Sequence, residues 1–200
     1  MTQGVESLTG QIVDKLWDEL GAVYGTRRRR KAASWVMQGV AWVLAWRGVM
    51  PQARFAQFAT TLRNTVYLPE WAWVPELRDL PAEVALAVHE HVHVTQWGWR
   101  YAWRYGTSAT WRARYEGEAY ATNLAMWYWA TGQWLDTQAL ADQMVRSYGG
   151  DAADGAVCYR CLEEERRTLL AGQVSSPVAA LAMAWLEIHG VQGRVALKMK

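Results

Sequence analysis

The segment His89-Glu90-His91-Val92-His93 carries imidazoles and a carboxylate at a spacing that suits a metal site on a helix. Helical residues four apart project side by side, so His89 and His93 can bind one zinc ion at about 2.0–2.1 Å. Glu90 lies on the flank of the same face, where it can take a proton from a water molecule at the metal without binding the ion. His91 points to nearly the opposite side and is predicted to be a packed or surface histidine. The spacing therefore predicts a zinc-dependent hydrolase with two histidine ligands and one general base.

A catalytic zinc ion usually has three protein ligands and one open coordination position. The next histidine after His93 is His189, so a third histidine close in sequence is missing. Glu116 and Glu118 follow His93 by twenty-three and twenty-five residues, a separation that allows a second helix to lie alongside the first. Either carboxylate is therefore a candidate third ligand.

Hydrolysis of a peptide bond also needs a group that stabilises the oxyanion. Tyrosine and histidine side chains can do this, and the sequence does not choose among Tyr101, Tyr115, Tyr120 and His189. The helix dipole alone is enough to explain His189, because it lies near the C-terminus of a predicted helix.

The elements that must position these residues are predicted to be mostly helical. Apolar residues recur at helical spacing over residues 8–23, and a second helix is predicted from Pro81 to about Gly98. β-forming residues within 55–68 predict one or two short strands. Further helices are predicted over residues 112–130, 136–147, 156–171 and 177–189.

The composition is that of a folded globular protein. Apolar residues make up 52% of the 200-residue chain and charged residues 20%, and the length suits about one domain. The net charge of +2 is too small to imply a polyanionic partner, so no nucleic-acid partner is expected. The 14 Trp residues indicate that some of them line a groove or contact an assembly partner.

Two features bear on the compartment. Cys158 and Cys161 are the only cysteines, so no disulfide framework is expected and both are predicted to be free thiols on a helix. Residues 1–11 lack a basic segment that leads into an apolar one, so no standard signal peptide is expected. A cytoplasmic or virion-associated location is therefore predicted.

A basic run at residues 27–31 precedes an apolar run at residues 32–46. The apolar run is shorter than the roughly 20 residues that a membrane span needs. A helix that is buried or packed on a partner is therefore favoured for 32–46 over contact with a membrane surface. The basic run is expected to be a solvated cap.

His89-Glu90-x-x-His93 with Gln96, followed by Tyr115-Glu116-Gly117-Glu118-Ala119, resembles the gluzincin branch of zinc metallopeptidases, and especially its small bacterial and phage members. The resemblance covers about residues 60–130. It implies that Glu118, directly before Ala119, is the preferred third ligand and Glu116 the alternative. It also implies a predominantly helical α+β, zincin-like domain over residues 51–200, with a small sheet and an active-site helix, preceded by an N-terminal helical extension over residues 1–50.

The chain departs from the larger gluzincins at one position. Those proteins have an Asp four residues after the ligand Glu to orient a histidine, whereas Thr122 follows Glu118 at that spacing. The histidines must then be oriented by another group, such as Asn123 or a backbone carbonyl. Gln96 lies one turn beyond His93, where it contacts substrate, holds Glu118 or caps the helix end.

The sequence therefore predicts a zinc metalloendopeptidase with one zinc ion per chain, a protein or peptide substrate and Glu90 as the catalytic base. The alternative is a non-catalytic structural or interaction protein on a zincin scaffold, in a virion for example, whose Trp-rich helices and residues 1–50 bind an assembly partner. Glu90 favours the enzyme, because a purely structural zinc site has no use for a general base.

Overall fold

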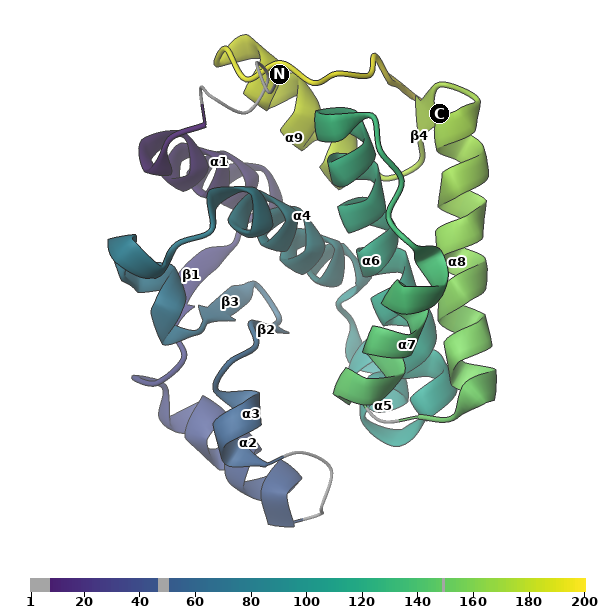
Figure 1. Cartoon of the computed structure of the whole chain (residues 1–200). Coiled ribbons are helices and arrows are strands. Elements are labelled where there is room, and N and C mark those ends of the chain that lie inside the picture. The colour runs from purple at the N-terminus through teal and green to yellow at the C-terminus, as the bar shows by residue number, and fades with distance from the viewer. Residues whose placement is uncertain (1–7, 47–50, 149) are drawn as a thin grey trace.

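The computed structural model describes residues 8–46, 51–148 and 150–200 of the chain. The predicted class, a predominantly helical α+β fold with a small sheet, is confirmed (Figure 1). Residues 1–7, which carry most of the segment assessed for a signal peptide, lie outside the described residues, as do residues 47–50, next to the predicted domain boundary.

Helices account for most of the described residues. The α-helices are α1 (Gly10–Tyr24), α2 (Trp35–Trp46), α3 (Gln52–Phe55), α4 (Leu80–Gln96), α5 (Trp99–Thr107), α6 (Ala109–Thr131), α7 (Thr137–Tyr148), α8 (Ala152–Leu170) and α9 (Pro177–Ile188). Two 3-10 turns, η1 (Glu70–Trp73) and η2 (Pro75–Leu77), precede α4. The strands are β1 (Arg27–Arg30), β2 (Thr60–Leu62), β3 (Thr65–Leu68), β4 (Gln173–Val174) and β5 (Lys198–Met199).

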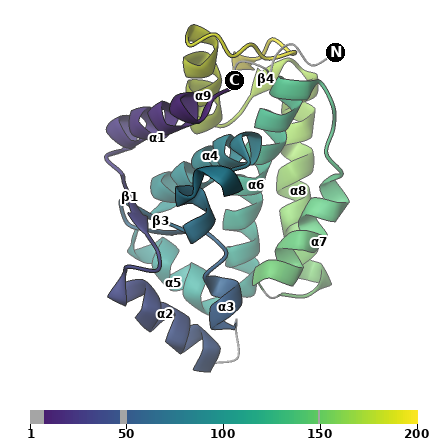
Figure 2. The ribbon, with the colours of Figure 1, turned by 60° about the vertical axis from the view of Figure 1, so that its left-hand side comes forward.

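Helix α4 runs through the interior, with α1 on one side and α6 on another (Figures 1 and 2). It begins where the Asp79 side chain accepts a hydrogen bond from the Ala82 N–H, and Pro81 occupies the first turn. Val84 and Val88 join the main core, and His89 and His93 are buried as well. Because α4 is covered on more than one side, its polar side chains need partners inside the protein.

Helix α6 packs between α4 and α8 (Figure 1). It begins at Ser108, whose hydroxyl accepts a hydrogen bond from the Trp111 N–H, and it ends at Gly132 with a left-handed φ of 69°. The short helix α5 before it was not predicted from the sequence.

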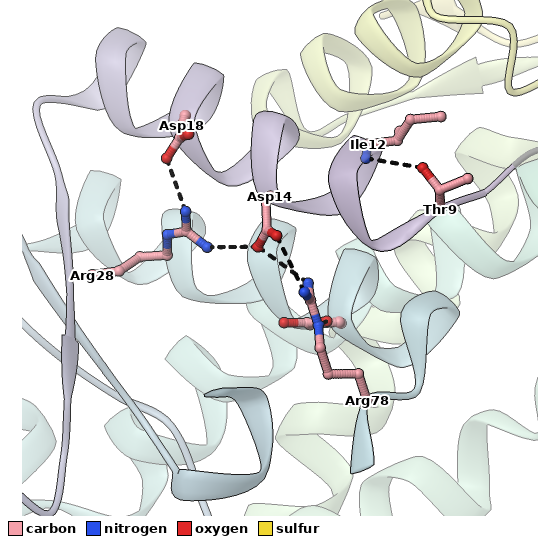
Figure 3. A network of polar contacts seen from close by, with 7 residues as sticks. Thr9, Ile12, Asp14, Asp18, Arg28 and Arg78 are labelled. Atoms are coloured by element: carbon pink, nitrogen blue, oxygen red, sulfur yellow. Dashed lines mark hydrogen bonds and ion pairs between the residues drawn. The ribbon is translucent and has the colours of Figure 1, made fainter. Parts of the chain in front are cut away.

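The three-stranded sheet has the order β1-β3-β2, with β1 parallel and β2 antiparallel to β3. Strands β2 and β3 confirm the prediction for residues 55–68, whereas the basic run was expected to be a solvated cap and instead forms β1. Arg28 explains part of the difference, because its guanidinium pairs with Asp14 and Asp18 of α1 at 3.3 and 2.9 Å. Asp14 also pairs with Arg78 at 3.2 Å, which ties α1 to the start of α4 (Figure 3).

Residues 10–30 belong to the same core as the rest of the described chain. Leu16 and Leu20 of α1 are fully buried in one cluster with Val88 of α4 and Leu124 of α6. Strand β1 pairs along its whole length with β3. The predicted division into an extension over 1–50 and a domain over 51–200 therefore does not match the packing. The apolar face of α1 packs against α4 and α6, and β1 pairs with β3, so both depend on residues after position 50.

Residues 32–46 were predicted to form a helix that is buried or packed on a partner, and α2 is not buried within the described chain. Met37 is its buried residue, and it packs with Phe55 and Tyr67 in a small separate cluster. Most of the remaining surface of α2 is partly or fully exposed. Within the three described ranges, no helix combines the length and the apolar character required to cross a membrane.

The contact of α6 with α8 gives a test of the packing. A Cβ atom at Gly117 would lie 3.0 Å from Cα of Cys158 and 3.1 Å from Cβ of Cys161, so Gly117→Ala is expected to destabilise the protein by about 1–3 kcal/mol. The control is Gly39→Ala in α2, where nothing lies within 4 Å and alanine is expected to stabilise the helix by about 0.5–1 kcal/mol. Equilibrium urea unfolding measures both, and equal shifts for the two variants would contradict the close approach of α6 and α8.

Candidate metal centre

His89, His93 and Glu116 come together between α4 and α6. His89 Nε2 lies 3.5 Å from Oε2 of Glu116, and His93 Nε2 lies 3.5 Å from Oε1 of the same carboxylate. One ligand atom from each residue falls within 4.8 Å of the other two, and all three residues are buried. Neighbouring ligand atoms of a tetrahedral zinc ion with 2.0–2.2 Å bonds are about 3.4 Å apart. The group can therefore hold a metal ion, and among the described residues it is the one cluster of three such side chains found.

The electrostatics of the cluster favour a positive charge between the three side chains. Burial raises the pKa of the Glu116 carboxyl, but the His93 and His89 imidazoles outweigh it and hold that pKa well below its usual range. Burial lowers the pKa of His93, but the charge of Glu116 raises it to about 9. Oε2 of Glu116 is also buried without a hydrogen-bond donor. A metal cation would supply the positive charge and satisfy this oxygen.

The structure places Glu116, and not Glu118, beside the two histidines. The resemblance implied Glu118 as the preferred third ligand, whereas this geometry favours the alternative, Glu116. Residues two apart on a helix point about 200° away from each other, so only one of them can face α4. Glu118 is partly exposed and accepts a hydrogen bond from Arg114 at 3.2 Å. It lines a separate groove together with Arg114 and Cys161.

Gln96 links Glu118 to the metal cluster. Its Oε1 lies 2.8 Å from Nδ1 of His93 and accepts the proton of that nitrogen, which leaves Nε2 of His93 free to face Glu116. Its Nε2 donates to Oε2 of Glu118 at 2.9 Å and to the Tyr115 carbonyl at 3.2 Å. Gln96 therefore holds Glu118, which is one of the roles predicted for it, and the hydrogen bond from Nδ1 to its Oε1 fixes the ring of His93.

Asn123 takes the equivalent position at the other histidine. Its side-chain amide lies 3.4 Å from Nδ1 of His89, and its Oδ1 is buried without a donor. With a metal bound at Nε2 of His89, Nδ1 would carry the proton of the neutral ring. If the side-chain amide of Asn123 is turned so that Oδ1 faces Nδ1 of His89, Oδ1 accepts the proton of Nδ1 and both atoms have a partner. Asn123 is then the residue that orients His89, one of the two options that the sequence analysis gave for this role.

His91 does not belong to the cluster. Its Nε2 lies 2.9 Å from the Thr26 hydroxyl and its Nδ1 lies 2.7 Å from the Ala87 carbonyl. The ring is fully buried against Trp17 and Tyr24. His91 was predicted to be a packed or surface histidine, and the structure shows it packed.

Tyrosines surround the carboxylate of Glu116. Tyr105 donates to its Oε1 at 2.5 Å, and burial together with the charge of Glu116 raises the pKa of Tyr105 and of Tyr148 well above the ordinary value. Both hydroxyls therefore stay protonated and can donate. Tyr120, one of the four candidate oxyanion donors, packs edge-on against His89 with ring centroids 5.1 Å apart.

His189 is not brought to the cluster. Its side chain is exposed, donates from Nδ1 to the Trp185 carbonyl at 2.8 Å and stacks on the Trp185 ring. The helix-end interpretation of His189 is therefore the one that fits, because this histidine satisfies a carbonyl near the C-terminus of α9.

A cavity of about 320 Å³ opens beside the cluster, and Glu90, His93 and Glu116 line it. Oε2 of Glu90 accepts a hydrogen bond from the Thr61 hydroxyl at 2.6 Å. The other walls are mainly apolar and come from α2, α3, β2 and α5, with Val40, Leu44, Phe55, Phe58, Leu62 and Tyr101 among them.

A buried lysine holds one wall of this cavity. Lys31 Nζ donates to the carbonyls of Phe55 and Phe58 at 2.6 and 2.8 Å and to the Thr60 hydroxyl at 2.7 Å. Burial lowers the pKa of Lys31 to about 7, and the charge of Glu90 acts in the opposite direction. Lys31 thereby fixes the segment that leads into β2 and to Thr61.

Sequence reasoning missed Thr61, Tyr105 and Tyr148. The spacing of four between Trp97, Tyr101 and Tyr105 is a sequence signal that could have identified one aromatic helix face. Tyr148 lies at the end of α7 and Thr61 in β2, and nothing in the local sequence connects either of them to His93.

The fold and the buried cluster define a mainly helical protein with a candidate metal centre of two histidines and one glutamate. No protein-family model matches the chain, and comparisons with curated proteins and with solved structures give no significant match.

The third ligand can be tested by metal content. Glu116→Gln is expected to lose the bound metal, because the amide removes the charge that faces both histidines, whereas Glu118→Gln is expected to retain it. Elemental analysis of the two purified variants beside the wild type measures this. Loss of metal in Glu118→Gln alone would restore the original preference for Glu118.

The roles of Asn123 and Gln96 in orienting the two histidines can be tested by measuring the affinity for zinc. Asn123→Leu and Gln96→Leu are each expected to weaken zinc binding by about 10–100-fold, because each removes the partner of a ligand Nδ1. Gln143→Leu, at an exposed position of α7, is the matched control and should leave the affinity unchanged. Competition with a chromogenic chelator gives the three dissociation constants, and wild-type values for both amide variants would exclude an orienting role.

Proposed function

We propose that the protein is a zinc-dependent metallohydrolase that cleaves peptide bonds, with His89, His93 and Glu116 as zinc ligands and Glu90 as general base. The observation that carries the proposal is the convergence of His89, His93 and Glu116 beside a cavity that His93, Glu116 and Glu90 line.

The donor set supports zinc. Two histidine nitrogens and one glutamate oxygen are the ligands of many catalytic zinc sites, and three protein ligands leave a coordination position open. Calcium and magnesium prefer sites made of oxygen ligands alone. Non-haem iron binds the same donor set, so the identity of the metal has to be measured by elemental analysis.

The chemistry of the site supports hydrolysis. A bound zinc ion would polarise a substrate carbonyl and lower the pKa of water. Because Oε2 of Glu90 is engaged by Thr61, Oε1 is the oxygen that can accept a proton from water and later deliver it to the leaving amine. Tyr148 lines the cavity with a protonated hydroxyl beside Glu116 and is a candidate donor to an oxyanion.

The walls of the cavity support a peptide with an apolar side chain next to the scissile bond. Leu44, Phe55 and Leu62 line the space on the side of α2, α3 and β2. Burying one large apolar side chain there would contribute about 1.5–3 kcal/mol to binding. This contribution is available to substrates that present such a residue beside the general base.

The proposed mechanism predicts that a substitution of Glu90 lowers peptide hydrolysis and leaves zinc binding intact. Glu90→Gln is expected to retain zinc and to lower hydrolysis of a fluorogenic peptide library by about 10²–10⁴-fold, because the amide cannot accept the proton. His93→Ala is expected to lose both zinc and activity. The matched control is Glu76→Gln, at an exposed position of η2.

Two outcomes would oppose the proposal. Unchanged turnover in Glu90→Gln would show that another group is the base. Stoichiometric zinc in the wild type without cleavage of any library member would favour the non-catalytic interaction protein.

A further inference from the structure

The basic residues of this chain are strongly segregated. Residues 20–69 contain eight Lys or Arg and residues 91–115 contain four, and neither segment contains an Asp or Glu. Nine basic and nineteen acidic residues remain for the rest of the chain. The small net charge therefore conceals one strongly basic part and one strongly acidic part.

Three helices from these two segments lie at the same end of the molecule, whereas the basic run at residues 27–31 lies apart from them at β1. The first contains α2 and α3 and the second contains α5, and these helices lie at one end in both views (Figures 1 and 2). Side chains from all three helices line the cavity beside the metal centre. These helices carry Arg54, Arg100 and Arg104 and no acidic residue, and we call α2, α3 and α5 together the basic end.

The basic end also carries most of the exposed tryptophan. Five of the six exposed Trp side chains are on α2 and α5, with exposed fractions of 82% for Trp35, 60% for Trp42, 76% for Trp46, 77% for Trp99 and 66% for Trp103. Positions 35, 42 and 46 fall on one face of α2, and the rings of Trp42 and Trp46 are stacked. Water-exposed indoles in such numbers mark an interaction surface.

We propose that the basic end binds the surface of an anionic membrane, with the tryptophans of α2 and α5 inserted at the level of the lipid headgroups. Tryptophan is enriched at membrane interfaces because its ring is apolar and its N–H is polar. Arginines beside it are attracted by anionic lipids. The twelve residues of α2 span about 18 Å, so the helix lies along the interface.

The character of α2 favours a membrane over a nucleic acid. Surfaces that bind single strands interleave basic and aromatic side chains along one groove. Helix α2 contains no charged residue over its twelve positions, and Val43 is exposed beside the tryptophans. A continuous uncharged face beside separate cations, such as Arg54 of α3 and Arg100 of α5, is the pattern of an interfacial helix.

This inference does not depend on the proposed hydrolysis, because it uses neither the metal nor Glu90. It adds a location to the site: a protein bound through α2 and α5 would hold the cavity next to the lipid surface.

Co-sedimentation of the full chain with vesicles tests the proposal. One set of vesicles is phosphatidylcholine alone and the other is phosphatidylcholine with phosphatidylglycerol, and binding to the second set is expected to be at least about tenfold stronger. Trp42→Ser with Trp46→Ser is expected to reduce that binding by about tenfold or more. Trp127→Ser, at an exposed position of α6, is the control and should bind like the wild type.

A second pair of variants tests the charge. Arg54→Gln with Arg100→Gln is expected to weaken binding to the anionic vesicles by roughly fivefold for each arginine. The matched control, Lys15→Gln with Arg160→Gln, removes two exposed charges from α1 and α8 and should have little effect.

Three results would overturn the proposal. They are absence of binding to anionic vesicles, equal binding to both compositions, and equal losses in the test and control variants. Tight binding of a single-stranded oligonucleotide by a protein that does not bind vesicles would also overturn it and would assign a nucleic-acid partner to the basic end.

Discussion

The buried carboxylate of Glu116 is the group on which the rest of the structure depends. A carboxylate removed from water costs several kcal/mol unless charged or hydrogen-bonding partners surround it. Here the partners come from α4 as His89 and His93, from α5 as Tyr105 and from the end of α7 as Tyr148. Three helices, α4, α5 and α7, therefore supply partners to one side chain of α6. A metal cation bound by the same three ligands would satisfy the carboxylate still better.

Around this group, each reactive side chain is held by a polar residue from a different element. Gln96 and Asn123 hold the Nδ1 atoms of the two histidines, so that both Nε2 atoms face Glu116. Thr61 of β2 holds one oxygen of Glu90, and Lys31 fixes the segment before β2 through three hydrogen bonds. The small sheet therefore does more than complete the fold. It sets the position of Glu90 relative to the histidines, and this relation decides whether the site can carry out acid–base chemistry.

The cavity connects two different parts of the molecule. Its inner end is the buried cluster of His93, Glu90 and Glu116, and its walls are the inner faces of α2, α3 and α5. The outer faces of α2 and α5 carry exposed tryptophans in segments that contain no acidic residue. The same short helices thus enclose the cavity and present the proposed membrane-binding surface. A substrate that reaches the site from a lipid surface would pass the tryptophans first and the cavity second.

The sequence by itself determined most of the helices and the first two candidate ligands, because both depend on local spacing. A helix over residues 80–96 places His89 and His93 side by side wherever it packs, and the apolar pattern predicted most of the other helices. It did not determine the third candidate ligand, because Glu116 and Glu118 are both on α6 and the choice depends on how α6 is rotated against α4. It also missed β1, α5, Thr61 and Tyr148, whose positions depend on contacts between residues far apart in the chain. Only the tertiary structure decided these, since a buried charge selects its partners by distance in space and not by distance along the sequence.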